Sequence, residues 1–125
     1  MKIIDTSVAI DHLRGRHEAT DLLSGLVAAG EVIAASELVR FELLAGARAT
    51  EAGALEAFFT VLKWIPVDEV VVRAAGALSR KHRPAHAGID TVDYVIAATA
   101  VLLDADLLTT NVGHFPMLKG LKAPY

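Results

Sequence analysis

Three acidic side chains, Asp5, Glu42 and Asp93, have the types and positions from which a metal-assisted hydrolytic site can be built. Carboxylates that converge repel one another unless they are protonated or bind a cation. Their hard oxygen atoms select Mg²⁺ or Mn²⁺. A cation held in this way can activate water and clamp a phosphodiester for in-line attack. This chemistry requires the elements of the chain to bring the three acids to one place.

The first of these acids ends the first predicted strand. Residues 2–5 form a short apolar strand that stops at Asp5, and Thr6 and Ser7 follow at once. In open α/β sheets, ligands bind beyond the carboxyl ends of the strands. We therefore expect Asp5 to face a ligand, and Thr6 and Ser7 to position Asp5 or a water molecule through hydrogen bonds.

The remaining candidates follow later strands or begin helices. Glu42 lies in the helix after the second predicted strand, and Asp90 and Asp93 lie in the first turn of the most apolar helix. Thr110 and Asn111 directly follow the fourth predicted strand. In a parallel sheet all of these places fall on or near one edge.

The pattern of the whole chain is that of an α/β protein, because strands alternate with helices throughout. It predicts one domain, 1–125, with a mostly parallel sheet of four or five strands and helices on both faces. Pro66 favours an edge position for its strand. The predicted helices are 6–13, 18–29, 36–49, 54–63, 68–80 and 90–104, and the predicted strands are 2–5, 31–35, 64–67, 106–110 and 121–124.

Composition excludes several classes of protein. The chain has no cysteine, which rules out a disulfide scaffold and thiolate metal sites. Its longest apolar stretch is far shorter than the roughly 20 residues that cross a bilayer, so we expect no membrane segment and a cytoplasmic location. A formal charge of −3 argues against a simple DNA-binding module, because such modules neutralise phosphates and are usually basic.

Each candidate also has a purely structural interpretation. Asp5 could cap the helix that follows it, and Glu42 could be a solvated helix residue. Asp90 with Asp93 matches a helix cap in which each residue bonds the other's backbone, close to the positive end of the helix. Only the joint pattern of these acids favours a functional site.

The motifs resemble those of PIN-domain ribonucleases of the VapC toxin type. The similarity covers nearly the whole chain and follows the same order and spacing. It is carried by Ile4-Asp5-Thr6-Ser7-Val8, by Glu42-Leu43-Leu44-Ala45-Gly46, by Asp93-Tyr94-Val95-Ile96-Ala97-Ala98-Thr99-Ala100, and by Leu108-Thr109-Thr110-Asn111 with His114-Phe115.

This resemblance implies a three-layer PIN-like fold and a magnesium-dependent endoribonuclease, with Mn²⁺ as an alternative ion. It carries Asp5, Glu42 and Asp93 onto the family's acidic positions, with Asp5 and Asp93 as metal ligands. It further implies an RNA substrate, a VapB-like antitoxin that neutralises the toxin, a homodimer, and contact with promoter DNA only through the antitoxin complex.

One position departs from the fullest acidic pattern of this family. Asn111 stands where a fourth carboxylate would complete the site, and its amide offers an oxygen but no charge. The number of metal ions, one or two, therefore stays open, and so does whether Asp90 or Asn111 completes the site. The alternative function is a catalytically weak PIN scaffold that acts as a binding or regulatory partner.

A basic cluster precedes Asp90 and gives candidates for RNA contact. Arg80, Lys81 and Arg83 could guide phosphates toward the acids. Cations are also favourable at the C-terminal end of a helix for electrostatic reasons alone, so both interpretations remain open.

Overall fold

The computed structural model describes residues 1–125 and has a parallel sheet as its centre. Its four strands are β1 (Lys2–Ile4), β2 (Ile33–Ser36), β3 (Lys63–Ile65) and β4 (Asp106–Leu108), in the spatial order β3-β2-β1-β4. All neighbouring strands pair in parallel, with Ile3 opposite both Ala34 and Leu107. The expected α/β class and parallel sheet are therefore confirmed.

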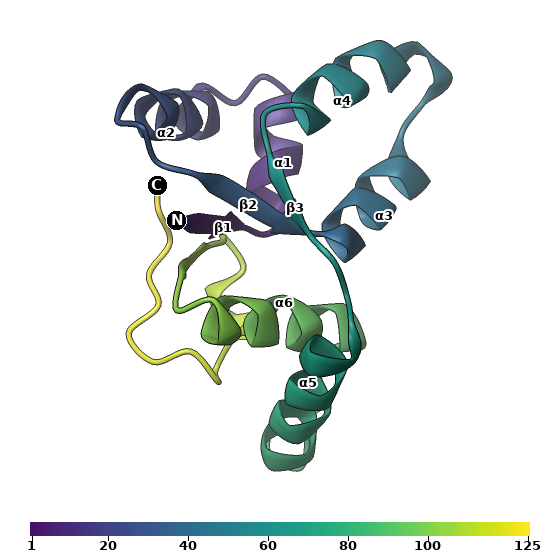
Figure 1. The fold of residues 1–125 in the computed structure, drawn as a ribbon, viewed down its shortest axis with the longest axis vertical. Coiled ribbons are helices and arrows are strands. Elements are labelled where there is room, and N and C mark those ends of the chain that lie inside the picture. Colours follow the sequence, from purple (N-terminus) through teal and green to yellow (C-terminus); the bar gives the residue numbers. More distant parts are fainter.

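Helices cover the sheet on both faces, which gives the expected three layers (Figure 1). Helices α1 (Thr6–Leu13), α2 (His17–Ala28) and α4 (Ala52–Phe59) lie on one side, and α5 (Glu69–His82) and α6 (Thr91–Leu102) lie on the other. Helix α3 (Glu37–Gly46) follows β2 and contacts both α1 and α6. Two short 3₁₀ helices, η1 (Ala49–Glu51) and η2 (Val112–His114), complete the chain.

The core forms where apolar strand residues meet the helices. Ile3 and Ile4 of the central strand β1 are fully buried, and α6 is buried from Asp93 to Ala100 because it packs between the sheet and α5. The apolar character of this helix nearly all round its axis is thus explained by its position. None of the helices is long and apolar enough to cross a bilayer.

Local sequence signals determine several helix ends. Ser36 accepts a hydrogen bond from the backbone N–H of Leu38, and Asp68 accepts one from Val71, so each caps its helix as expected. Gly30 ends the turn after α2 with a φ of +75°, a conformation that costs glycine little.

The structure corrects several of the predicted bounds. Helix α3 ends at Gly46 rather than Ala49, because Ala47 is extended and the N–H of Arg48 bonds the Glu51 carboxylate at 2.8 Å to start η1. Helix α4 runs over Ala52–Phe59 rather than the predicted 54–63, and Lys63 begins β3. Residues 121–124 form no strand, because Gly120 turns the chain at a φ of +73° and Pro124 has no N–H for a ladder.

Pro66 indicated an edge strand, and β3 does lie at an edge of the sheet. The other edge is β4, which pairs with β1 alone among the strands. The two central strands, β1 and β2, are each followed directly by a helix. The N-terminal caps of these helices, α1 and α3, are Asp5 and Ser36. This arrangement places the start of α1 and the start of α3 at the same edge of the sheet.

Candidate active site

Asp5 is the most constrained of the candidate acids. It follows β1 directly, is only 4% exposed, and caps α1 by accepting a hydrogen bond from the N–H of Thr6 at 2.8 Å. Its second oxygen accepts hydrogen bonds from the hydroxyls of Thr109 at 2.7 Å and Ser7 at 3.1 Å. The capping and functional interpretations of Asp5 are therefore compatible, since one oxygen is held by the helix and the other by hydroxyls.

The hydroxyls around Asp5 also hold the loop after β4. The Ser7 hydroxyl accepts from the N–H of Thr110 at 3.1 Å, and the Thr109 hydroxyl accepts from the N–H of Asn111 at 3.0 Å. The Thr110–Asn111 turn is thus fixed against Asp5 through two side chains. Thr109, which is fully buried, was not among the predicted site residues. Thr109 lies inside the stretch Leu108–Asn111 that resembles the family motif, and this resemblance could have identified it as a site residue.

Glu42 reaches the site through Thr6. The hydroxyl of Thr6 donates to Glu42 Oε1 at 2.6 Å, which joins the start of α1 to the middle of α3. The sequence predicts that Thr6 positions either Asp5 or a water molecule. The backbone N–H of Thr6 positions Asp5, whereas its hydroxyl positions Glu42.

Asp93 and Asp90 form the reciprocal cap that the sequence suggested. The N–H of Asp93 donates to Asp90 Oδ1 at 3.1 Å, and the N–H of Asp90 lies 3.4 Å from Asp93 Oδ2. Asp90 is exposed, whereas Asp93 is buried. Capping therefore explains the position of Asp90. Asp93 is a buried acid, and few contacts offset the free-energy cost of burying its charge.

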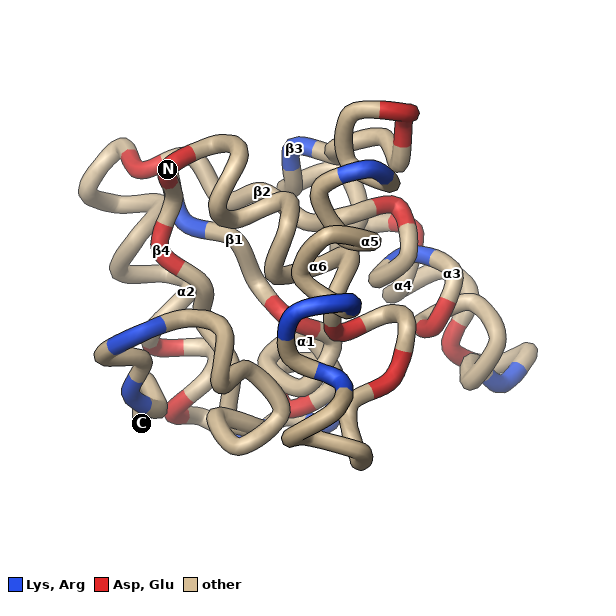
Figure 2. Tube along the Cα trace, turned by 90° about the horizontal axis from the view of Figure 1, so that it is seen from below, with Lys and Arg blue, Asp and Glu red and all other residues tan.

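Burial and neighbouring carboxylates raise the pKa of Asp93 to about 6. Loss of water is the largest cause, the charge of Asp90 adds to it, and the charge of Asp5 contributes as well. Asp5 and Asp93 are therefore close enough to repel each other. Figure 2 shows acidic residues gathered around the end of β1 and the start of α6. A strongly perturbed carboxylate in such a place is a mark of a functional site.

His114 contacts this acid from the other side and was not among the predicted site residues. Its Nδ1 lies 3.4 Å from Asp93 Oδ2, and its side chain is 53% exposed. The charge of His114 opposes the upward shift in the pKa of Asp93. His114 stands beside Phe115 in the family-like motif, but its contact with Asp93 spans the fold and has no local sequence signal.

The donor set fits a small hard cation. Asp5 and Asp93 provide carboxylate oxygens, and Mg²⁺ is usually bound through one or two carboxylates while it keeps several waters. No three side chains of the histidine, cysteine, aspartate or glutamate types converge into a ready-made metal cage. The arrangement therefore suits a hydrated ion held by two acids better than a fully protein-ligated one.

The basic candidates do not contact the acids. Arg80 and Lys81 lie in the last turn of α5, and Arg83 follows the helix. All three are exposed, and none forms an ion pair in the structure. Their position at the C-terminal end of α5 agrees with the favourable electrostatics of cations there.

A groove lies next to Glu42. It has a volume of about 500 Å³ and is formed by α1, the end of α3, η1 and α4. Its apolar lining includes Ile10, Leu13, Leu43 and Leu55, and Arg14, Arg48 and Glu51 contribute charge. Such a mixture of apolar floor and charged rim is typical of a binding site.

Comparisons with known proteins agree with this geometry. The PIN domain family model matches residues 2–116. Over the full length of both chains, the sequence is 60% identical to ribonuclease VapC19 of Mycobacterium tuberculosis. It is 38% identical to ribonuclease VapC10 of the same organism, with all of this chain and 93% of the relative covered.

Solved structures show the same fold. VapBC2 from Rickettsia felis, bound to a DNA fragment from its promoter, matches with a TM-score of 0.81 at 23% identity, over 98% of this chain and 96% of that one. DNA-bound VapBC from Salmonella typhimurium matches with a TM-score of 0.83 at 17% identity, over 98% and 96%.

Proposed function

Because this chain belongs to the PIN-domain family and is similar to VapC ribonucleases over its full length, we propose that it is a magnesium-dependent endoribonuclease toxin. The observation that supports this most directly is the buried pair of carboxylates, Asp5 and Asp93, at the carboxyl edge of the sheet. The 60% identical relative is named a ribonuclease, which supports RNA as the substrate.

The proposed roles follow from the contacts of each acid. Asp5 and Asp93 would hold Mg²⁺, or Mn²⁺ in its place. When bound, such an ion supplies a water molecule of lowered pKa and positive charge beside the reacting phosphate. Glu42, held by the Thr6 hydroxyl, orients the attacking water. Ser7 and Thr109 fix the Asp5 carboxylate, so that little reorganisation is needed during the reaction.

RNA cleavage by the purified protein tests this proposal. We expect cleavage with Mg²⁺, and we expect EDTA or Asp5→Asn to lower the rate by at least about 100-fold, since such groups act mainly in the transition state. Asp21→Asn is the matched control, because Asp21 is an exposed acid of α2. RNA cleavage that survives EDTA would contradict the metal-dependent mechanism.

A catalytically weak scaffold is the second candidate, and Asn111 is the observation that favours it. This residue is exposed after β4, where a carboxylate would add a further charged ligand. Expression in bacteria separates the two candidates. The toxin should arrest growth, and Asp93→Asn should relieve the arrest. Equal growth with both soluble proteins would favour the scaffold.

We further propose that a VapB-like antitoxin neutralises the protein by occupying the groove beside Glu42. The related solved structures are complexes named VapBC, which supports a partner of this class. The apolar floor of the groove suits an amphipathic segment of the antitoxin. Contact with promoter DNA would then arise only through the antitoxin complex.

A bulky charge in the groove tests this docking site. Ala54 is exposed and lines the groove, so Ala54→Arg should weaken antitoxin binding at least 10-fold while RNA cleavage persists. Ala77→Arg on the exposed face of α5 is the control. Unchanged affinity of the Ala54→Arg protein, measured by calorimetry, would place the antitoxin elsewhere.

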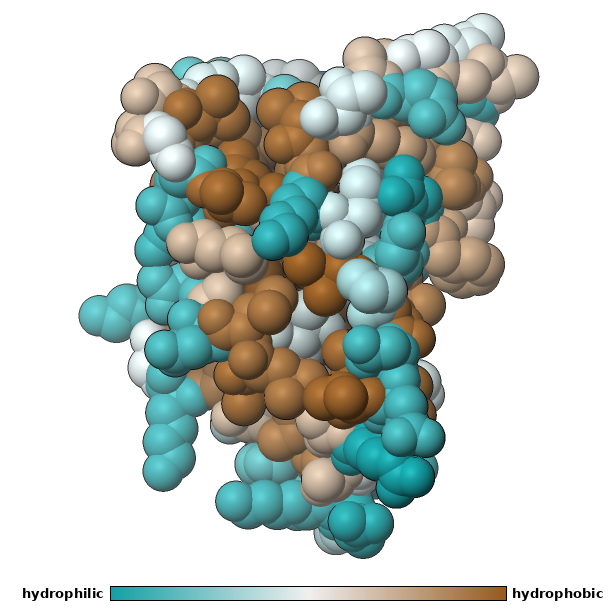
Figure 3. Space-filling model, viewed as in Figure 1, coloured by the Kyte–Doolittle hydropathy of each residue, from teal (hydrophilic) through white to brown (hydrophobic).

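A homodimer completes the proposal. Apolar side chains are exposed on two of the helices, with Phe41 of α3 exposed by 64% and Val70 of α5 by 60%. Figure 3 shows apolar surface between charged residues over the part of this face where α5 and α6 lie. Exposed patches of this kind mark protein interfaces. Light scattering of the purified protein measures the oligomeric state directly.

A further inference from the structure

The carboxylates of the candidate site would repel the phosphates of an RNA substrate. Asp5, Glu42, Asp90 and Asp93 form no ion pair with any lysine or arginine. An RNA phosphodiester carries negative charge, so it must approach a cluster of the same sign. His114 is the one basic side chain that contacts an acid of the site.

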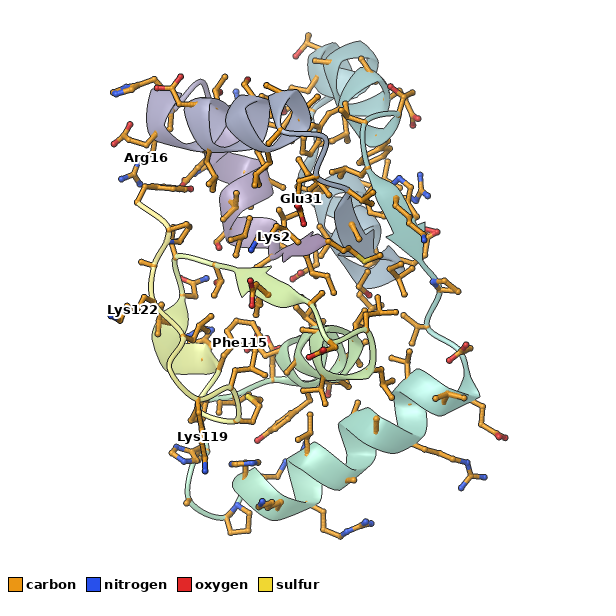
Figure 4. All side chains as sticks on the ribbon, turned by 60° about the vertical axis from the view of Figure 1, so that its left-hand side comes forward. Lys2, Arg16, Glu31, Phe115, Lys119 and Lys122 are labelled. Carbon is orange, nitrogen blue, oxygen red and sulfur yellow. The ribbon has the colours of Figure 1, made fainter.

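The backbone around His114 is held in place. The N–H of His114 donates to the carbonyl of Asn111 at 2.9 Å, and the N–H of Phe115 donates to the carbonyl of Val112 at 3.0 Å. Phe115 is 1% exposed and belongs to the main core. Figure 4 shows Phe115 inside the molecule, whereas Lys119 and Lys122, further along the same segment, point outward. The core thus fixes η2 and orients His114 toward Asp93.

The imidazole can meet a second partner in this position. Only one ring nitrogen, Nδ1, lies toward Asp93, and more than half of the side chain is exposed. When both ring nitrogens carry a proton, Nδ1–H can donate to the Asp93 carboxylate while Nε2–H donates to a phosphate; a ring with a single N–H can serve only one of these two acceptors. Substrate-binding groups are most useful when the scaffold orients them in advance.

We propose that His114 is an RNA-contact residue that donates a hydrogen bond to the backbone phosphate beside the acid pair. This inference rests on the proposed ribonuclease function and adds a specific substrate contact to it. Arg80, Lys81 and Arg83 remain predicted RNA contacts, and His114 adds a basic group that, unlike them, contacts an acid of the site.

The test compares His114→Ala with His17→Ala. His17 is a matched control because its Nδ1 also contacts a carboxylate, that of Glu18 at 3.2 Å, and its side chain is 82% exposed on α2. Loss of the His114 contact should raise KM about 5- to 10-fold and leave kcat within about 2-fold, as expected when ground-state and transition-state binding are lost equally. His17→Ala should change neither constant.

Binding without cleavage provides an independent measurement. In an Asp5→Asn background, His114→Ala should weaken the affinity for a single-stranded RNA about 5- to 10-fold by fluorescence anisotropy, while His114→Gln, which keeps an N–H donor, should recover most of it. An unchanged KM and unchanged RNA affinity would overturn the proposal. A raised KM together with an unchanged RNA affinity in the Asp5→Asn background would also overturn it, because His114 would then act through Asp93 and not on the RNA.

Failure of the proposed ribonuclease function can be distinguished from failure of the His114 contact. If the wild-type protein cleaves no RNA under any metal condition, the proposed function fails before His114 is considered. If the wild type cleaves RNA and His114→Ala behaves identically, only the RNA contact is wrong.

Discussion

At the candidate site, the burial of carboxylates and their mutual charge repulsion work against the stability of the fold. Asp93 is buried near Asp5 and Asp90, and its pKa of about 6 means that ionising it in the folded protein costs free energy. Asp5, by contrast, accepts hydrogen bonds from the hydroxyls of Ser7 and Thr109. Asp93 has a distant contact with His114 and one weak backbone bond. We interpret Asp93 as the residue that most needs a cation.

We expect Asp93→Asn to stabilise the metal-free protein at pH 8. The folded pKa of Asp93 is raised from 3.8 to about 6, so the folded state binds more protons between these values and stability falls as pH rises through that range. A neutral amide removes the cost, and the gain should be about 1–3 kcal/mol at pH 8 and near zero below pH 4. Urea unfolding in EDTA measures it.

Asp21→Asn is the control for this prediction, because the same change on an exposed face of α2 should leave the free energy of unfolding unchanged. If Asp93→Asn is no more stable than the wild type at pH 8, then Asp93 is better compensated than its contacts indicate. Addition of Mg²⁺ should raise the melting temperature of the wild type and not that of the variant.

At the scale of the elements, the interface between α5 and α6 contains an unpaired polar group. Tyr94 is 2% exposed, and its hydroxyl has no hydrogen-bond partner. It belongs to a small apolar cluster with Val71 and Ala75 of α5 and Val95 of α6. A buried hydroxyl without a partner costs about 1–3 kcal/mol. The pairing of these two helices is therefore weaker than its apolar contacts would allow.

Tyr94→Phe should raise the free energy of unfolding by about 1 kcal/mol, because it removes the unpaired hydroxyl and keeps the ring in its cluster. Chemical denaturation at neutral pH measures the change. A loss of stability would mean that the hydroxyl is satisfied in solution, for example by a buried water.

The sequence predicted elements better than their ends. Ser36 and Asp68 were correctly expected to cap α3 and α5, because capping uses side chains close to the helix start. The end of α3 was placed too late, because no proline or glycine follows Gly46 to mark the extended backbone at Ala47. The last predicted strand, 121–124, was wrong, since alternation alone says nothing about whether a sheet edge is available.

The sequence could not predict those contacts of the site that join residues far apart along the chain. The acidic residues follow from strand ends and from motifs, and their catalytic roles remain predictions. The partners of those acids, Thr109 for Asp5 and His114 for Asp93, arise from contacts across the fold that no local spacing encodes. The contact between Thr6 and Glu42 likewise depends on how α1 and α3 pack.

At the scale of the whole molecule, the segment after β4 is fastened to the first two helices. The Tyr125 hydroxyl donates to Asp11 at 2.7 Å, and the Arg16 guanidinium lies 4.9 Å above the Tyr125 ring. Burial and the Asp11 carboxylate raise the pKa of Tyr125 above its usual value. The hydroxyl therefore stays protonated as the pH rises, and this attachment should hold throughout the neutral range.

Tyr125→Phe should lower the free energy of unfolding by about 1 kcal/mol, since Asp11 loses a hydrogen bond. The sign is opposite to that expected for Tyr94→Phe, although both changes remove one hydroxyl. Urea unfolding at pH 6 and at pH 9 should give the same loss. Equal stability of the variant and the wild type would show that the attachment contributes nothing measurable.

The bond between Thr109 and Asp5 joins residues 104 positions apart, and β1 pairs with β4 over a similar separation. Contacts of this kind close late in folding, because the chain between them must first be ordered. During translation, Asp5 emerges from the ribosome early but lacks its hydroxyl partners until residue 109 has followed. Under the proposed toxin function, a nascent chain would lack a complete Asp5 site for most of its synthesis, and a VapB-like antitoxin already present would have that interval in which to bind it.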